Sequence, residues 1–186
     1  MPHLDVLYKM QLIDSFNTDR LHLRIPQLSD ARSIFDAYAQ DVEVCRYMTW
    51  LPYNELAAYE AWLAVKIDSI GKTAATFVLC DIDNSSRILG MVDATIGSFK
   101  AEVGYALSKG EWGKGLMTEA ISRFVKLLLS VDEIYRVSAV CDLDNPASAR
   151  VMEKSGMIYE GILRRYIIHP NISDEPRDVK SYSIIK

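Results

Sequence analysis

Residues 102–129, EVGYALSKGEWGKGLMTEAISRFVKLLL, predict a strand, a glycine-rich loop and a helix in direct succession. Val103, Tyr105 and Leu107 alternate with small or polar neighbours, which is the period of two typical of a half-buried strand. From Leu116 onward, apolar residues recur every three or four positions, so a helix with one apolar face is expected. We expect the strand to lie in the middle of a sheet and to lead directly into its long helix.

The loop between them, Gly110-Glu-Trp-Gly-Lys-Gly115, predicts a site for a phosphate or pyrophosphate. Gly113 and Gly115 have no side chains, so a ligand can approach the main chain closely. The first amides of a helix have no partner inside it and carry partial positive charge. Two common nucleotide motifs do not fit, because Thr118 holds the third glycine position of a dinucleotide-binding loop and Gly115 follows Lys114 where a Walker loop needs Ser or Thr.

The composition indicates a soluble globular protein with a single domain over residues 1–186, of which 1–18 form a lead-in segment. Apolar residues make up 49% of the chain and charged residues 25%, and the net charge of −4 gives no reason to expect a nucleic-acid partner. No run of about 18 apolar residues suggests a membrane span, and the N-terminal residues do not resemble a signal peptide. Three scattered cysteines favour a reducing cytoplasm, and three scattered histidines predict no metal site.

The order of patterns along the chain predicts a mixed α/β or α+β fold with a largely antiparallel sheet. A parallel step is expected across each crossover helix. Helices are expected to begin after Ser29, Asn54, Gly115 and Asn145, the last with Pro146 at its first position. Strands are expected at 20–25, 73–82, 87–96, 102–107, 135–141, 157–163 and 179–185.

Two segments, Glu102-Val-Gly-Tyr105 and Glu111-Trp-Gly-Lys-Gly-Leu-Met-Thr-Glu-Ala120, resemble the coenzyme A signature of the GNAT superfamily of acetyl-CoA-dependent N-acetyltransferases. The resemblance is strongest to the Rim-like branch, which contains the ribosomal-protein N-terminal acetyltransferases. Gly110 departs from the pattern, because the signature usually has Gln or Arg there. From Thr18 onward the resemblance implies a six- to seven-stranded sheet flanked by about four helices and splayed between the fourth and fifth strands, with pantetheine in the splay.

The resemblance also implies how acetyl-CoA is held. Residues 112–117 would supply main-chain amides to the pyrophosphate, and Lys114 would add a cation. A main-chain N–H, assigned to Leu107, would polarise the acetyl carbonyl, and Asn145 would bind the pantetheine amide. The predicted cofactor-binding residues are therefore Tyr105, Ala106, Leu107, Ser108, Trp112, Gly113, Lys114, Gly115, Leu116, Met117, Asn145 and Ser148.

Glu102 is the candidate base for deprotonating the acceptor amine, because a carboxyl group in an apolar strand needs a partner or water, and burial would make it more basic. Alternatively, Glu102 is an ordinary ion-paired glutamate, and a water chain takes the proton instead. Ser148 is the candidate donor to the leaving thiolate, since it matches the Asn-x-x-Ser pattern of the Rim-like branch. Many GNAT members use a tyrosine instead, at a position held here by Met152. Ser148 could also serve as a helix cap alone.

The leading functional hypothesis is a cytoplasmic enzyme that moves an acetyl group from acetyl-CoA directly to a protein N-terminal α-amine, such as that of a ribosomal protein. Trp50 and Tyr53, in an aromatic connection, are candidate acceptor contacts. No histidine near Cys141 would activate it, so an acyl-cysteine intermediate is not expected. The alternatives are a small-molecule amine (a polyamine, amino sugar or amino-acid-like compound) as acceptor, or a non-catalytic acyl-CoA-binding module. Neither membrane nor nucleic acid is an expected partner, no metal is expected, and the protein is predicted to be a monomer or a homodimer.

Overall fold

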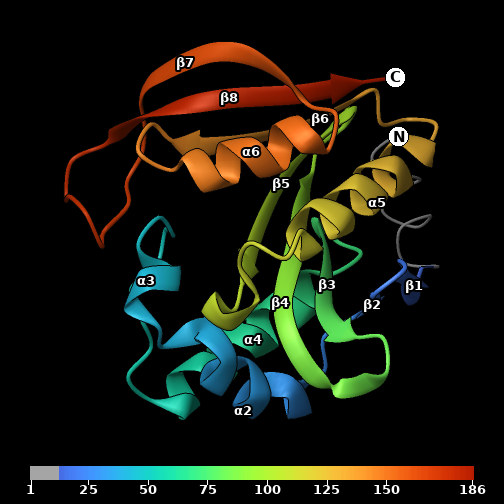
Figure 1. Cartoon of the computed structure of the whole chain (residues 1–186), viewed down its shortest axis with the longest axis vertical. Coiled ribbons are helices and arrows are strands. Elements are labelled where there is room, and N and C mark those ends of the chain that lie inside the picture. The colour runs from blue at the N-terminus through green and yellow to red at the C-terminus, as the bar shows by residue number, and fades with distance from the viewer. Residues whose placement is uncertain (1–12) are drawn as a thin grey trace.

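An eight-stranded sheet runs through the middle of the molecule in the order β1-β2-β3-β4-β5-β6-β8-β7 (Figure 1). The structure is a computed structural model, and it describes residues 13–186; the expectations for residues 1–12 lie outside this range. Every neighbouring pair of strands is antiparallel except β5 and β6, which are parallel. The strands are β1 (Ser15–Asn17), β2 (Leu21–Arg24), β3 (Ala74–Asp81), β4 (Asn84–Ile96), β5 (Lys100–Leu107), β6 (Arg136–Asp142), β7 (Ile158–Ile167) and β8 (Arg177–Ile185).

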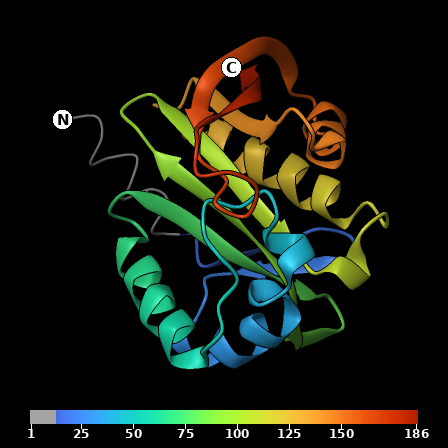
Figure 2. The same cartoon turned by 90° about the vertical axis from the view of Figure 1, so that its left-hand side faces the viewer.

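Helices cover both faces of the sheet, α5 and α6 on one side and α2, α3 and α4 on the other (Figures 1 and 2). The segment expected as one first helix consists of a 3-10 turn, a short α-helix and a π-helix, because its backbone hydrogen bonding changes twice along one apolar stripe. The bounds are α2 (Ala31–Ile34) followed by the π-helix Phe35–Ala39, α3 (Val42–Cys45), α4 (Leu56–Ser69), α5 (Leu116–Ser130) and α6 (Pro146–Lys154).

The predicted fold class is confirmed, with one more strand and one more helix than the sequence indicated. Strand β1 lies in the expected lead-in segment and pairs with β2 at the edge of the sheet. Helix α3 lies in the aromatic connection. Both elements are three or four residues long, which is too short for hydrophobic periodicity to reveal them.

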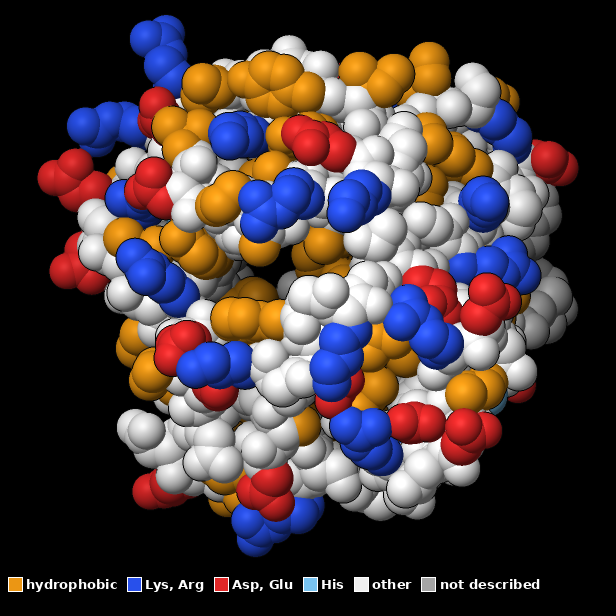
Figure 3. Space-filling view, in the orientation of Figure 1, with side chains coloured by type: hydrophobic (Ala, Val, Ile, Leu, Met, Phe, Trp, Pro, Cys, Tyr) orange, Lys and Arg blue, Asp and Glu red, His pale blue; other side chains and the backbone are white. Residues whose placement is uncertain are grey.

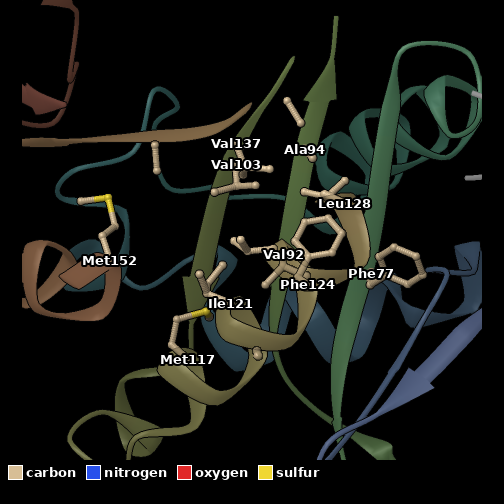
Figure 4. Packing of buried hydrophobic residues seen from close by; sticks show 14 of the residues in the cluster. Phe77, Val92, Ala94, Val103, Met117, Ile121, Phe124, Leu128, Val137 and Met152 are labelled. Atoms are coloured by element: carbon tan, nitrogen blue, oxygen red, sulfur yellow. The ribbon is translucent and has the colours of Figure 1, made fainter. Parts of the chain in front are cut away.

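The apolar stripe predicted for the long helix packs on the middle of the sheet. Met117, Ile121, Phe124 and Leu128 of α5 point at strands β3, β4 and β5 (Figure 4). Phe124 and Leu128 are fully buried, and the ring of Phe124 lies 5.7 Å from that of Phe77. Burial of a large apolar side chain stabilises the fold by about 1.5–3 kcal/mol, so this helix fixes the position of the loop in front of it.

Strands β5 and β6 pair over three positions, from Lys100 opposite Arg136 to Glu102 opposite Ser138. Beyond these positions β5 stays paired with β4 and β6 stays paired with β8, so the two strands part. The predicted splay between the fourth and fifth expected strands is therefore confirmed. The amide of Ser108 donates to the carbonyl of Leu89 on β4. Since peptide groups alternate along a strand, the N–H of Leu107 points the other way, into the splay.

Within residues 13–186, none of the helices combines the length and the apolar character that crossing a bilayer requires.

Candidate active site

The splay opens into a cleft of about 970 Å³. Figure 3 shows a hollow near the middle of the molecule, with apolar side chains at its edge and Lys and Arg side chains above it. Most of the residues predicted for the cofactor and the acceptor line this cleft: Trp50, Tyr53, Glu102, Tyr105, Ala106, Leu107, Trp112, Gly113, Gly115, Leu116, Met117, Asn145 and Ser148. Of the predicted set, Ser108 and Lys114 do not line it.

The start of α5 presents main-chain donors to the cleft. Gly113 and Gly115 have φ values of 76° and 79°, which is the left-handed region that other residues rarely adopt. Gly115 is the N-cap, and as a glycine it offers no side-chain cap; no side chain of residues 13–186 takes that place. A Cβ on Gly113 would meet nothing within 4 Å, so the space beside it is open. These features are those of an anion site at a helix start.

The loop before α5 is held by ion pairs to a buried carboxylate and by hydrogen bonds to main-chain carbonyl oxygens. Glu111, which is 8% exposed, binds Arg87 at 2.6 Å and Lys114 at 2.9 Å. Arg20 donates to the carbonyl oxygen of Lys114 at 2.9 Å, and the Trp112 indole donates to the carbonyl oxygen of Leu107 at 2.8 Å. The Lys114 ammonium is therefore bound to Glu111, whereas the sequence suggested that it faces phosphates.

Glu119 ties the first turn of α5 to the chain before β2. Its carboxylate accepts hydrogen bonds from the Thr18 hydroxyl and from the amide and guanidinium of Arg20. Burial acts in the opposite direction, but these bonds prevail and hold the pKa of Glu119 below its usual value.

The start of α6 forms the opposite wall. The side chain of Asn145 accepts a hydrogen bond from the Ser148 amide at 3.1 Å, and Pro146 follows at the first helical position, so the predicted cap is confirmed. The Ser148 hydroxyl lies 2.8 Å from the hydroxyl of Tyr105, which reaches across the splay from β5. Burial raises the pKa of Tyr105. Met152 is fully buried and has no group to donate.

Two cations on α6 were missed by the sequence analysis. Arg150 and Lys154 line the cleft one helical turn apart, and both are exposed. Neither forms an ion pair with a carboxylate of the described chain. Their four-residue spacing was visible in the sequence, but nothing there showed that this face of the helix borders the cofactor loop.

Cys141 also lines the cleft, on β6 beside α6. Burial raises the pKa of its thiol to about 11. The thiol is thus protonated at neutral pH, and only the thiolate is a good nucleophile. The geometry favours direct transfer over an acyl-cysteine.

On the other face of the sheet, Glu102 faces a chamber between β4, β5 and α4. Residues alternate across a strand, and Ala101 and Val103 pack in the core under α5, so Glu102 and Gly104 face away from it. Glu102 is exposed, so the burial assumed in the argument for a base is absent. The charge of Glu102 raises the pKa of Tyr166, on β7.

An aromatic cluster forms the wall of this chamber. The Tyr53 ring lies 5.7 Å from that of Trp50, 5.1 Å from that of Tyr59 and 6.4 Å from that of Trp62. The side chain of Asn171, in the loop between β7 and β8, donates to the carbonyl oxygen of Trp50 at 2.8 Å. The structure therefore brings Trp50 and Tyr53 to the end of the cleft where Glu102 lies.

His169 borders the cleft at the same end, and no sequence signal pointed to it. Its side chain is 5% exposed, and neither ring nitrogen has a hydrogen-bond partner in residues 13–186. Nε2 lies 3.7 Å from a carboxylate oxygen of Asp142, which Arg177 and the amide of Asp144 also bind. Burial lowers the pKa of His169 and outweighs the opposite effect of Asp142.

This lowered pKa predicts a loss of stability in mild acid. The unfolded chain takes up a proton on this histidine near pH 6.5, before the folded chain does, so the free energy of unfolding falls as the pH drops through that value. Asp142, whose pKa is held low mainly by Arg177 against the effect of burial, loses its contribution in a lower range, below about pH 4.

The melting temperature of His169→Gln should therefore fall less than that of the unaltered protein between pH 7.5 and pH 5.5. Denaturation scans of both proteins at the two pH values measure this difference. Equal decreases in the two proteins would show that His169 does not cause the loss of stability in mild acid.

The comparisons with known proteins agree with this geometry. Residues 20–158 match the family model described as Acetyltransferase (GNAT) domain. The Bacillus subtilis (strain 168) protein named "Uncharacterized N-acetyltransferase YoaA" is 31% identical over 91% of this chain and 95% of its own. The "[Ribosomal protein uS5]-alanine N-acetyltransferase" of Escherichia coli (strain K12) is 27% identical over 81% of each chain. The Vibrio cholerae spermidine N-acetyltransferase, solved with CoA and spermine, superposes with a TM-score of 0.74 at 21% identity, over 89% of this chain and 95% of its own.

The fold, the splay and the open helix start define an acyltransferase of the kind that uses acyl-CoA donors. The chain belongs to the GNAT acetyltransferase family and is an N-acetyltransferase. The resemblance found in the sequence is thereby confirmed, and the relative that acetylates a ribosomal protein supports the Rim-like branch.

Proposed function

We propose that this enzyme transfers an acetyl group from acetyl-CoA directly to a protein N-terminal α-amine, such as that of a ribosomal protein, in the cytoplasm. The observation that carries the proposal is the arrangement of the cleft. Main-chain donors at the start of α5 lie at one end, and a carboxylate without a basic partner in the described chain lies at the other.

The residues at the α5 end fit the diphosphate of acetyl-CoA. The open amides of residues 113–117 bind phosphate oxygens, and Arg150 and Lys154 add positive charge across the cleft. The pantetheine arm follows β5, where Tyr105, Ala106, Leu107 and Ser108 lie, and Asn145 binds one of its amides. The N–H of Leu107, directed into the splay, polarises the acetyl carbonyl.

Glu102 acts on the acceptor. It takes a proton from the bound ammonium, through water where the distance requires it, so that the neutral amine attacks the acetyl carbon. A hydrogen bond from Ser148, at the start of α6, stabilises the leaving thiolate, and the partial positive charge of that helix end adds to the effect.

The charges along the cleft favour an acceptor with one ammonium group over a polyamine. Among the described residues that line it, Glu102 is the acid without a Lys or Arg partner. A polyamine carries several ammonium groups, each of which is favoured by a nearby carboxylate, whereas an N-terminal α-amine carries one. The other acids are paired: Glu43 with Lys109, Asp93 with Lys66, Glu111 with Arg87 and Lys114, and Asp142 and Asp144 with Arg177.

The alternative acceptor is a small amine. The structural likeness to the Vibrio cholerae spermidine enzyme keeps this candidate open, and the aromatic wall of Trp50 and Tyr53 fits an apolar or ring-shaped amine as well.

Release of free CoA thiol from acetyl-CoA separates these candidates. We expect turnover with peptides that carry a free N-terminal amine, none with the same peptides blocked at the N-terminus, and little with spermidine or spermine. Turnover on polyamines alone would show that the acceptor is a small molecule. Tight CoA binding with no turnover on any of these amines would contradict the proposed acceptor classes.

A further inference from the structure

The hydroxyl groups of Tyr105 and Ser148 form a hydrogen-bonded pair in the cleft. The tyrosine oxygen lies 2.8 Å from Ser148 Oγ and 3.1 Å from the Ser148 carbonyl oxygen. These atoms come from β5 and α6, the two walls that the splay separates. Both residues line the cleft, so the pair lies on the path assigned above to the pantetheine arm and its sulfur.

The hydroxyl protons of Tyr105 and Ser148 can be arranged in two ways. A hydroxyl has one proton to donate and can accept through its oxygen. In the first arrangement, Ser148 donates to Tyr105, and Tyr105 donates to the Ser148 carbonyl, so neither has a proton left for a ligand. In the second, Tyr105 donates to Ser148 Oγ, and the Ser148 proton is free to point at another atom.

We propose that Tyr105 is the positioning residue for the leaving thiolate: by donating its own proton to Ser148 Oγ, it directs the Ser148 hydroxyl at the sulfur atom of CoA. This inference rests on the proposed transfer of acetyl groups from acetyl-CoA. It assigns to β5 a task that many family members give to a tyrosine on α6, at the position where this chain has the buried Met152.

The step balances without a further reactant. The amine nitrogen forms a bond to the acetyl carbon, the bond from that carbon to sulfur breaks, and its electron pair stays on sulfur. Two hydrogen bonds in series, from Tyr105 to Ser148 and from Ser148 to sulfur, stabilise this charge. The ammonium gives its first proton to Glu102 before the attack, and the nitrogen gives up a second proton to water once it is bonded to the acetyl carbon. The thiolate takes a proton from solvent when CoA departs.

The environment of Tyr105 favours a hydrogen bond over the loss of its proton. Its hydroxyl is buried, and burial raises its pKa, so it remains protonated while the thiolate forms. Hydrogen bonds to a charged partner are stronger than those between neutral groups, and more so away from water. The contact therefore strengthens when negative charge develops on sulfur.

The pKa of the CoA thiol in the complex tests this proposal. The ultraviolet absorbance of the thiolate, measured as a pH titration of the CoA complex against the protein alone, gives this pKa. Hydrogen bonds to a charged group contribute about 1.5–3 kcal/mol, so Ser148→Ala should raise the thiol pKa by about one unit or more. Tyr105→Phe should raise it by a smaller amount, because Tyr105 acts on the sulfur only through Ser148. Because the two act in series, the double variant should raise it by no more than Ser148→Ala alone.

Two variants serve as controls. Ser148→Thr keeps a hydroxyl and should raise the thiol pKa by less than Ser148→Ala does. Tyr182→Phe removes another buried tyrosine hydroxyl bonded to α6, at Glu153 Oε1 3.0 Å away, but outside the cleft, and should leave the thiol pKa unchanged. Variants that raise the thiol pKa more should turn over more slowly. In Ser148→Ala, kcat should fall by roughly tenfold to a thousandfold, while the KM for acetyl-CoA changes little.

CoA titrations of each variant by calorimetry separate this inference from the proposed function. Failure of the unaltered protein to bind CoA would remove both. If CoA binds but Tyr105→Phe leaves the thiol pKa unchanged, the inference is wrong and the function stands. Tighter CoA binding by Tyr105→Phe without a change in that pKa would show instead that the contact merely closes the empty cleft, which also overturns the inference.

Discussion

Replacing Gly113 by valine should abolish measurable binding of acetyl-CoA. The residue adopts a φ of 76°, and the open space beside it is where the diphosphate is expected to approach. A β-branched side chain costs about 1–2 kcal/mol in this conformation and displaces the phosphate from the amides. Loss of two hydrogen bonds to a charged group, at about 1.5–3 kcal/mol each, weakens binding by roughly a hundredfold or more. Titration calorimetry measures the affinity.

Gly110→Val is the matched control. It lies in the same loop, its φ is not positive, and a Cβ there would meet nothing within 4 Å. It should bind acetyl-CoA as the unaltered protein does. Equal affinities in all three proteins would show that the glycine loop does not hold the cofactor.

Glu102→Gln should lower the turnover number by roughly a hundredfold to ten-thousandfold, the range of general base catalysis, with little change in CoA affinity. The amide cannot accept the ammonium proton, so hydroxide or water must do so. The pH dependence of the rate should also differ between the two proteins, because only the unaltered enzyme has a carboxylate that can accept the ammonium proton. The rate of the variant should keep rising in alkaline solution, where hydroxide replaces the missing base. Rates at saturating acetyl-CoA over a range of pH measure both effects.

Glu60→Gln makes the same chemical change on the exposed side of α4, outside the cleft, and should have no effect. A Glu102→Gln enzyme with the rate and pH profile of the unaltered protein would remove Glu102 from the mechanism. A water chain would then be the base.

The parts of the site that the sequence predicted depend on neighbours in the chain. The strand, the glycine loop and the start of α5 at Leu116 follow from local periodicity and from glycines with positive φ. The cap at Asn145 and the third helical position of Ser148 follow in the same way. Local signals of this kind were enough to recognise the family and to place both walls of the cleft.

The parts that the sequence did not predict depend on residues far apart in the chain. The contact between Tyr105 and Ser148 joins residues 43 positions apart. Glu111, which binds Lys114, is itself bound by Arg87, 24 positions away in the chain. His169 enters the cleft through a loop that the sequence showed as merely polar. Exposure of Glu102 could not be predicted either, because periodicity gives the face of a strand and not what covers it.

The most direct test of the central claim is a crystal structure of the protein with CoA bound. We expect the diphosphate within hydrogen-bond distance of the main-chain amides of residues 113–117, and the pantetheine arm between β5 and β6 with its sulfur near Ser148. A diphosphate held anywhere else, or a splay that stays closed with CoA on the surface, would contradict the account.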